Sequence, residues 1–361
     1  MSIIESNIWR NNYTNARKLF RKYTKMNYQK YFSDKRYGNF VIDDNEDTTI
    51  DYLFLHNSEK QNQKLNIIIS GTHGVEGYPG SVMQCTTLDS IIKEKHIYDT
   101  ERTSYLFIHS LNPYGYFHNR RCTKNNVDLN RNYLDKFQTT DYPQQIYELI
   151  TTYLYSFKFI FLFFSILFQY GYTKSREYIV KGQYNYDKGL FYGGEKREYN
   201  IDVLEIILNK VNISSYADIC IYDIHTGLGK YGNLSVMVQN HTYEKITKFI
   251  CLNGTTEIVN VSLDSMYQDS KGSITEGIEQ YFKRKSFEGS IYPIILEYGT
   301  YSNIQIFIGL VLENYYYINN SIDWYIRQNK LRKLFFPDKK YWKLLVLSNY
   351  DDIMSQFNCQ I

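Results

Sequence analysis

Two residues that could bind one metal ion lie close together early in the chain. His73 and Glu76 follow the apolar run at residues 67–69, in a turn that also contains Gly71, Gly74 and Gly77. An imidazole and a carboxylate on one tight loop can bind the same divalent ion. A lone His-x-x-Glu pair is also typical of an ordinary polar turn, so a metal site requires further ligands elsewhere in the chain.

Two later segments supply suitable residues. His225 follows a strand-like run at residues 217–224, and Glu297 ends another apolar run that begins at Tyr292. Two His and one Glu are typical ligands of catalytic zinc, which leaves a fourth position for water. A second carboxylate that is not a ligand can then take a proton from that water. These residue types indicate metal-assisted hydrolysis.

A polar segment between these runs is rich in Arg and Asn. It contains Arg120-Arg121 and Asn130-Arg131, and such side chains usually lie in surface loops. A functional role requires them to converge on an anion. One Arg could stabilise a developing oxyanion, and an Asn-Arg pair could hold a substrate carboxylate through paired hydrogen bonds.

In this order, the residues resemble the motifs of the zinc carboxypeptidase superfamily, which also contains the aspartoacylase and succinylglutamate-desuccinylase deacylases. The segments at residues 70–77, 127–132, 223–229 and 297–300 read Ser-Gly-Thr-His-Gly-Val-Glu-Gly, Val-Asp-Leu-Asn-Arg-Asn, Asp-Ile-His-Thr-Gly-Leu-Gly and Glu-Tyr-Gly-Thr. More specifically, they resemble a bacterial branch of that superfamily with no assigned function. The resemblance covers most of residues 40–320.

The resemblance implies a role for each residue at the strand ends. His73, Glu76 and His225 would bind zinc, and Glu297 would act as general base and later as proton donor. Asp223 could orient His225, provided that the strand is regular, because side chains two residues apart on a strand point to the same side.

The same resemblance implies roles for the polar segment. Either Arg121 or Arg120 would stabilise the oxyanion, and the sequence leaves both open. Asn130 and Arg131 would hold the substrate carboxylate. Asp128 is interpreted as a loop-capping residue rather than as a ligand. Members of this superfamily also use a late Tyr near the substrate, and the candidates here are Tyr267, Tyr281 and Tyr301.

The elements that must position these residues alternate between strands and helices. Strands are predicted at residues 40–42, 52–55, 67–69, 105–109, 217–224, 234–238 and 292–300, and the first two form an antiparallel hairpin. Helices are predicted within residues 1–35 and at 80–95, 143–172 and 201–211. This pattern predicts an α/β fold with a mixed, mostly parallel central sheet flanked by helices, like that of the zinc carboxypeptidases within the phosphorylase/hydrolase-like folds. We expect one catalytic domain over residues 1–361, with an N-terminal helical segment at 1–38 and a C-terminal cap at 304–361.

Composition excludes several other classes of protein. The net charge is only +3, without long runs of one sign, which argues against nucleic acid as the main partner. The five cysteines are scattered and form no Cys-x-x-Cys pair, so neither a disulfide framework nor a cysteine zinc site is expected. No signal peptide is visible, and a cytoplasmic location is predicted.

The most apolar stretch of the chain is at residues 157–168. It is about a dozen residues long, whereas a helix that crosses a bilayer needs roughly 20. We therefore predict a buried helix and no transmembrane segment, with peripheral membrane contact as the alternative.

Taken together, the sequence predicts a zinc-dependent, metallocarboxypeptidase-like hydrolase that cleaves an amide (peptide) bond near a free carboxylate. One alternative is an aspartoacylase-like deacylase, and its substrate would be an N-acyl amino acid rather than a peptide. A second alternative is a catalytically silent binding protein on the same fold. The substrate and the oligomeric state stay open.

Overall fold

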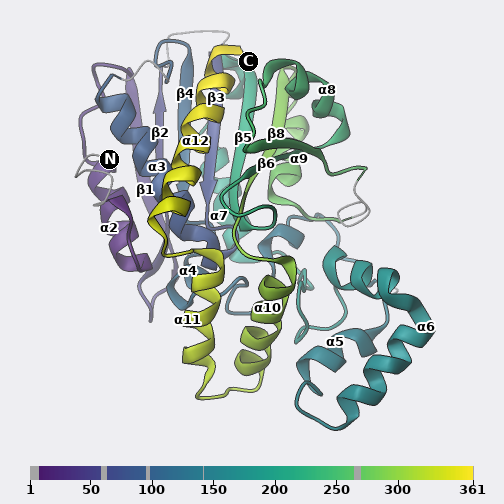
Figure 1. The fold of residues 1–361 in the computed structure, drawn as a ribbon. Helices are drawn as coiled ribbons and strands as arrows, with labels where there is room; N and C mark the ends of the chain where they lie inside the picture. Colours follow the sequence, from purple (N-terminus) through teal and green to yellow (C-terminus); the bar gives the residue numbers. More distant parts are fainter. Residues whose placement is uncertain (1–7, 58–62, 95–97, 141, 264–269, 361) are drawn as a thin grey trace.

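An eight-stranded sheet runs through the centre of the molecule (Figure 1). The computed structural model describes residues 8–57, 63–94, 98–140, 142–263 and 270–360. The strands are β1 (Asp34–Asp43), β2 (Thr48–His56), β3 (Gln63–Ser70), β4 (Thr103–His109), β5 (Tyr216–Gly227), β6 (Leu234–Val238), β7 (Thr256–Asn260) and β8 (Ser290–Gly299). Their order in the sheet is β1-β2-β4-β3-β5-β8-β6-β7.

The strand pairing confirms the predicted mixed sheet. β3 pairs in parallel with β4 and β5, β5 pairs in parallel with β8, and β6 pairs in parallel with β7. The pairs β1–β2, β2–β4 and β6–β8 are antiparallel, so the predicted N-terminal hairpin is also confirmed. Because β3, β5 and β8 are parallel neighbours, the residues at their carboxyl ends lie along one edge of the sheet.

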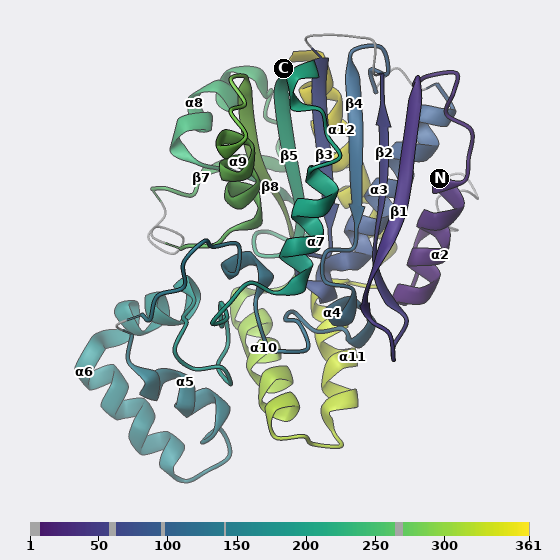
Figure 2. The ribbon, with the colours of Figure 1, turned by 180° about the vertical axis from the view of Figure 1, so that it is seen from behind.

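Helices cover both faces of this sheet. One face carries α2 (Tyr13–Thr24), α3 (Gly77–Ile92), α8 (Asn240–Phe249) and α12 (Lys340–Gln360), and the other carries α7 (Tyr199–Leu208) and α9 (Ile274–Arg284) (Figures 1 and 2). The position of β3 in the sheet explains why residues 67–69 form a continuous apolar run. Ile68 packs into the apolar core beneath α2, α3, α8 and α12, and Ile67 and Ile69 pack into the core beneath α7 and α9. A strand that is buried on both faces needs apolar residues at consecutive positions.

The remaining helices lie beyond the carboxyl ends of these central strands. They are α4 (Pro113–His118), α5 (Gln144–Thr151), α6 (Lys158–Lys181), α10 (Asn303–Ile318) and α11 (Trp324–Phe335). Helices α10 and α11 lie side by side, and α5 and α6 project at the corner of the molecule next to α10 (Figures 1 and 2). Apart from the cores on the two faces of the sheet, a further apolar core joins α5, α6, α10 and α11.

The prediction of a buried helix at residues 157–168 is wrong. Helix α6 covers this stretch, but Phe161 and Phe164 are 75% and 64% exposed and Phe168 is 96% exposed. Both faces of the sheet are already covered by other helices, so the outer side of α6 meets no partner in the described part of the chain. Among the described residues, no helix has the length and apolar character needed to cross a membrane.

Candidate metal centre

The loop after β3 brings His73 and Glu76 to the same side. Gly71 adopts the left-handed conformation (φ 64°) that this turn requires and that disfavours other residues. The backbone then forms a 3₁₀ turn at Gly74–Glu76. A Cβ atom at Gly74 would lie 2.0 Å from the backbone carbon of Gly115 in α4, so only glycine allows this close approach. The glycines of the motif therefore shape the loop that carries both side chains.

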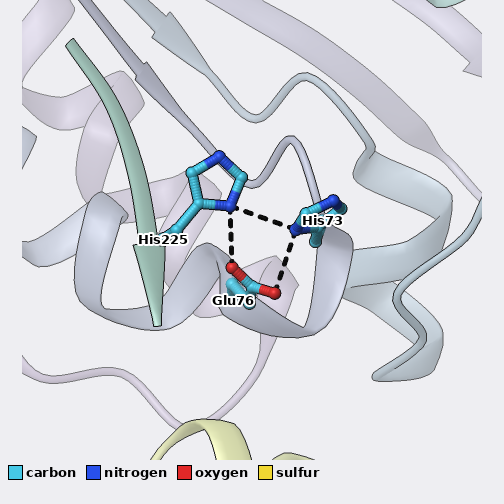
Figure 3. Close-up of side chains that lie close together, drawn as sticks. All are labelled: His73, Glu76 and His225. Atoms are coloured by element: carbon cyan, nitrogen blue, oxygen red, sulfur yellow. Dashed lines mark hydrogen bonds and ion pairs between the residues drawn. The ribbon is translucent and has the colours of Figure 1, made fainter. Parts of the chain in front are cut away.

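The parallel pairing of β3 and β5 places His225 opposite this loop. Ser70 is the register partner of Ile224, so His225 comes one position beyond the end of β3. His225 Nδ1 lies 3.0 Å from His73 Nδ1 and 2.9 Å from Glu76 Oε2, and His73 Nδ1 lies 3.0 Å from Glu76 Oε1 (Figure 3). All three residues are buried. Three side chains from distant parts of the sequence thus converge on one point.

The outer nitrogen of each imidazole faces a carboxylate. His73 Nε2 lies 3.1 Å from Asp128 Oδ1, and His225 Nε2 lies 2.8 Å from Asp223 Oδ2. Thr72 in turn donates a hydrogen bond to Asp223 Oδ1 at 2.7 Å. A carboxylate in this position holds the imidazole proton on Nε2 and leaves the Nδ1 lone pair free to bind a metal.

This donor set fits a divalent cation. Two Nδ1 lone pairs and a carboxylate face one another within 3.0 Å, an arrangement that is repulsive unless a positive charge lies among them. Two imidazoles and one carboxylate are ligands that zinc prefers, and a carboxylate orients each imidazole. His73, Glu76 and His225 form a group that could hold a metal ion.

The electrostatics of the site also favour positive charge. Burial alone would raise the pKa of Glu76, but the imidazoles of His73 and His225 hold that pKa well below its usual value. Burial alone would lower the pKa of His225, but Asp223 and Glu76 raise it well above the usual value. Burial opposes the charge of Asp128 too, yet Arg121 and His73 keep the pKa of Asp128 well below its ordinary range.

Glu297 lies on the strand next to His225. These two residues are register partners in the parallel pair β5–β8, and Glu297 Oε1 accepts a hydrogen bond from the backbone of Leu228 at 2.9 Å. Burial, together with the negative charge of Glu76, raises the pKa of Glu297 to about 8. Glu297 therefore differs from Glu76, because its environment favours the protonated carboxyl group. Such a group can exchange a proton near neutral pH.

The structure separates the two arginines that the sequence leaves open. Arg121 Nε donates to Asp128 Oδ2 at 2.9 Å, and Arg121 Nη1 lies 3.4 Å from Glu76 Oε1, so this guanidinium lies beside the metal ligands. Arg120 points away from them and is fully buried in an ion pair with Glu313, with Nε 2.7 Å from Oε1. Neighbouring residues on this segment thus face opposite sides.

The predicted carboxylate-binding pair is partly engaged within the protein. Arg131 donates from Nε, Nη1 and Nη2 to the backbone carbonyl oxygens of Lys181, Asn130 and Val180. Asn130 Oδ1 accepts from the backbone of Ile274 at 3.0 Å. A guanidinium has five N–H groups, so two at Arg131 remain for a ligand.

Apart from Arg120, the predicted metal-binding, catalytic and carboxylate-binding residues line one cavity of about 610 Å³. The lining includes the three candidate metal ligands together with Glu297, Arg121, Asn130 and Arg131. Two of the candidate tyrosines do not line it. Tyr281 of α9 donates a hydrogen bond to Asn209 at the end of α7, and Tyr301 packs against Tyr231. Tyr267 lies outside the described residues.

Asp128 is the site residue whose role the sequence analysis missed in part. As predicted, its side chain caps a turn by accepting a hydrogen bond from the backbone of Asn130. It also orients His73 and pairs with Arg121. The available signal was its position two residues before Asn130-Arg131, within the motif of the polar segment. The suggested contact of Asp223 with His225 is confirmed.

The site is thus a His-Glu-His cluster at the carboxyl edge of a mixed, mostly parallel sheet flanked by helices. The chain belongs to the family described as "Protein of unknown function (DUF2817)", whose model matches residues 9–349. No curated protein matches the chain.

Several solved structures are similar to the chain, and two metallo-carboxypeptidases are among them. Thrombin activatable fibrinolysis inhibitor is 13% identical, with a TM-score of 0.47, over 96% of this chain and 73% of the other. A metallo-carboxypeptidase from Burkholderia cenocepacia is 10% identical, with a TM-score of 0.46, over 96% and 69%. A metallo-carboxypeptidase from Pseudomonas aeruginosa is 11% identical, with a TM-score of 0.41, over 94% and 69%. At this level of similarity, the function must be argued from the side chains of this chain.

Proposed function

We propose that the chain is a zinc-dependent hydrolase that cleaves an amide bond near a free carboxylate. The observation that carries this proposal is the convergence of His73, Glu76 and His225 in a cavity that also holds Glu297. The two histidines and Glu76 would hold the ion. When bound, zinc lowers the pKa of a water molecule and polarises a carbonyl group.

The side chains around this point have distinct roles in the proposal. Glu297 takes a proton from the attacking water and later delivers it to the leaving nitrogen, a role open to a carboxylate that lines the same cavity as the metal ligands without being one of them. Arg121 stabilises the negative charge that develops on the carbonyl oxygen. The two remaining N–H groups of Arg131 bind the substrate carboxylate.

Metal analysis of the purified protein tests the first half of the proposal. We expect one zinc ion per chain in the wild type and a loss of that ion in His73→Ala. His241→Ala is a matched control, because this side chain is 50% exposed and pairs only with Glu279 among the contacts described. A wild-type protein that takes up no stoichiometric zinc would contradict the proposal.

A hydrolysis screen tests the second half. Peptides and N-acyl amino acids serve as substrates, and Glu297→Gln serves as the blank. This variant keeps the size of the side chain but removes the base, so we expect at least a hundredfold loss of kcat. Equal turnover by wild type and Glu297→Gln would remove Glu297 from the mechanism. Zinc binding without turnover of any substrate would favour a silent binding protein.

A further inference from the structure

The cavity at the metal centre has a second, apolar part. Its wall is formed by α5, α6 and α10, with Leu149 and Ile150 from α5, Phe163 and Ile166 from α6, and Leu310 from α10. These helices lie beyond the carboxyl ends of the central strands (Figures 1 and 2). The apolar wall therefore borders the place where the candidate catalytic groups converge.

The polar lining residues gather mainly elsewhere. Asn130, Arg131, Gln239, Ser273 and Glu276 line the cavity from the polar segment, the end of β6 and the start of α9. Hydrogen bonds connect several of these residues. Asn130 Oδ1 accepts one from the backbone N–H of Ile274, which follows Ser273, and Gln239 Nε2 donates one to Glu276. The cavity thus has a polar wall suited to a carboxylate and an apolar wall on the α5, α6 and α10 side.

The apolar wall offers few partners to a peptide. Ser175 and Arg176 are polar lining residues on α6. The hydroxyl of Ser175 donates to the carbonyl oxygen of Gly171 at 2.7 Å, and Arg176 also interacts within the protein. A peptide carries an N–H and a C=O at every residue, and each group that is buried without a partner costs roughly 1–3 kcal/mol. A hydrocarbon chain has no such groups and gains free energy from burial against apolar side chains. The wall is therefore better suited to a hydrocarbon chain than to a peptide backbone.

The cavity is large enough for a long hydrocarbon chain, and some of its lining residues on α6 are also exposed at the surface. Its volume is about 610 Å³, which lies within the range of pockets that enclose whole small ligands. Phe163 and Tyr172 both line it, and they are 40% and 72% exposed. A chain that is longer than the cavity can extend past them along the exposed apolar side of α6.

We propose that the substrate is an N-acyl amino acid whose acyl group is a long, unbranched hydrocarbon chain. The amino-acid carboxylate binds at Arg131, and the acyl chain lies against α5, α6 and α10. Water adds to the amide carbon, the C–N bond breaks, the hydroxyl group stays on the acyl carbon, and the nitrogen takes up the proton. The products are a fatty acid and a free amino acid. This inference rests on the proposed hydrolase function and names its substrate class.

The test compares N-acyl-alanines from acetyl to dodecanoyl with the zinc-loaded enzyme, at concentrations where the substrates are monomeric. Burial of one methylene group contributes enough to raise kcat/KM roughly three- to fourfold, so we expect a steady rise with chain length until the cavity is full. Short peptides with the same C-terminal alanine form the second arm. We expect their kcat/KM to be lower than that of dodecanoyl-alanine.

Two matched variants on α6 test where the acyl chain of the substrate binds. Phe163→Asn places a polar amide in the apolar wall and should lower the ratio of dodecanoyl- to acetyl-alanine turnover at least tenfold. Phe161→Asn makes the same change on the same helix, at a side chain that is 75% exposed and does not line the cavity. We expect no change in the ratio for this control. Equal effects of the two variants would contradict the binding of the acyl chain against α5, α6 and α10.

The outcomes separate this inference from the proposed function. If acetyl-alanine or a peptide is hydrolysed with no gain from chain length, the inference is wrong and the hydrolase function stands. If nothing is hydrolysed, the hydrolase function fails. Calorimetry with the zinc-loaded Glu297→Gln variant then compares the binding of dodecanoyl-alanine with that of acetyl-alanine. Binding no tighter than that of acetyl-alanine would also overturn the inference.

Discussion

Substitution of Arg120 should destabilise the protein, whereas substitution of its neighbour Arg121 should reduce its activity. The Arg120 guanidinium is fully buried and contacts Glu313 Oε1 at 2.7 Å and Asn126 Oδ1 at 2.9 Å. It also stacks on the ring of Tyr317, at 3.3 Å from the ring centroid. Arg120→Met keeps much of the apolar volume but removes every hydrogen-bond donor. Within the described part of the chain, the carboxylate of Glu313 would then keep the indole N–H of Trp324 as its one side-chain donor.

The expected cost follows from the burial of this pair. Glu313 is 3% exposed, so its charge cannot be hydrated when Arg120 is lost. Breaking a buried ion pair on one side typically costs 3–5 kcal/mol, and we expect about 4 kcal/mol here. Replacing both partners with apolar residues of similar size is often neutral. Arg120→Met with Glu313→Leu should therefore recover at least half of the lost free energy of unfolding.

Urea unfolding of the single and double variants measures these free energies, and kinetics on the folded proteins separates the two arginines. We expect Arg120→Met to keep kcat/KM within a few-fold under conditions where it is folded. Arg121→Met should lower kcat by about 10²–10³, the usual effect of removing one oxyanion donor. A stable Arg120→Met protein without activity, beside a fully active Arg121→Met, would refute the assignment.

Three further perturbations test other parts of the structure. Asp223→Asn should weaken zinc binding about 10–100-fold, measured by competition with a chelator, because the carboxylate fixes His225; an unchanged affinity would contradict this role. Gly74→Ala should destabilise the fold by about 1–3 kcal/mol or more in urea unfolding, because its Cβ would meet the backbone of Gly115, and a neutral effect would mean that the loop can move. Burial lowers the pKa of His109 to about 3. Between pH 6.5 and 3, the unfolded protein therefore binds a proton at this residue that the folded protein does not bind. The free energy of unfolding consequently falls as the pH falls. Between pH 6.5 and 4.5 this group should cost about 2 kcal/mol, and urea unfolding of the metal-free protein should show a shallower acid loss for His109→Gln than for wild type.

The strands and their order along the chain could be predicted because the central strands are buried on both faces. Runs such as the one at residues 67–69 are continuous and β-branched, and the polar motif residues follow directly where each run ends. The position of strands in the sheet is not encoded in such local patterns. The adjacency of His225 and Glu297 depends on β8 joining the sheet beside β5, which only the three-dimensional arrangement reveals. The short strand β7 and the helices α8 and α9 were not predicted.

Local patterns also could not determine which side chains face the cavity. Arg120 and Arg121 are adjacent and chemically identical, and they differ only in the direction that an irregular segment gives them. Hydrophobicity alone suggested burial for residues 157–168, whereas the helix uses one side to line the cavity and leaves Phe161 and Phe168 exposed. An apolar sequence indicates that a surface needs a partner, and the rest of the fold decides whether that partner belongs to the chain.

The charge balance of the site gives an independent reason for a divalent cation. Glu76, Asp128, Asp223 and Glu297 are all at most 8% exposed, and the guanidinium of Arg121 pairs with two of them. Arg131 lies in the same cavity, but so does the carboxylate of Glu276, so the carboxylates outnumber the guanidiniums. Buried carboxylates without compensating charge are costly, and a divalent ion would supply positive charge where it is lacking. The raised pKa values of His225 and Glu297 point in the same direction, because both groups take up protons where positive charge is lacking. The ligand set would favour zinc among divalent ions, and the same charges would keep the ion at the edge of the sheet where His73 and His225 meet.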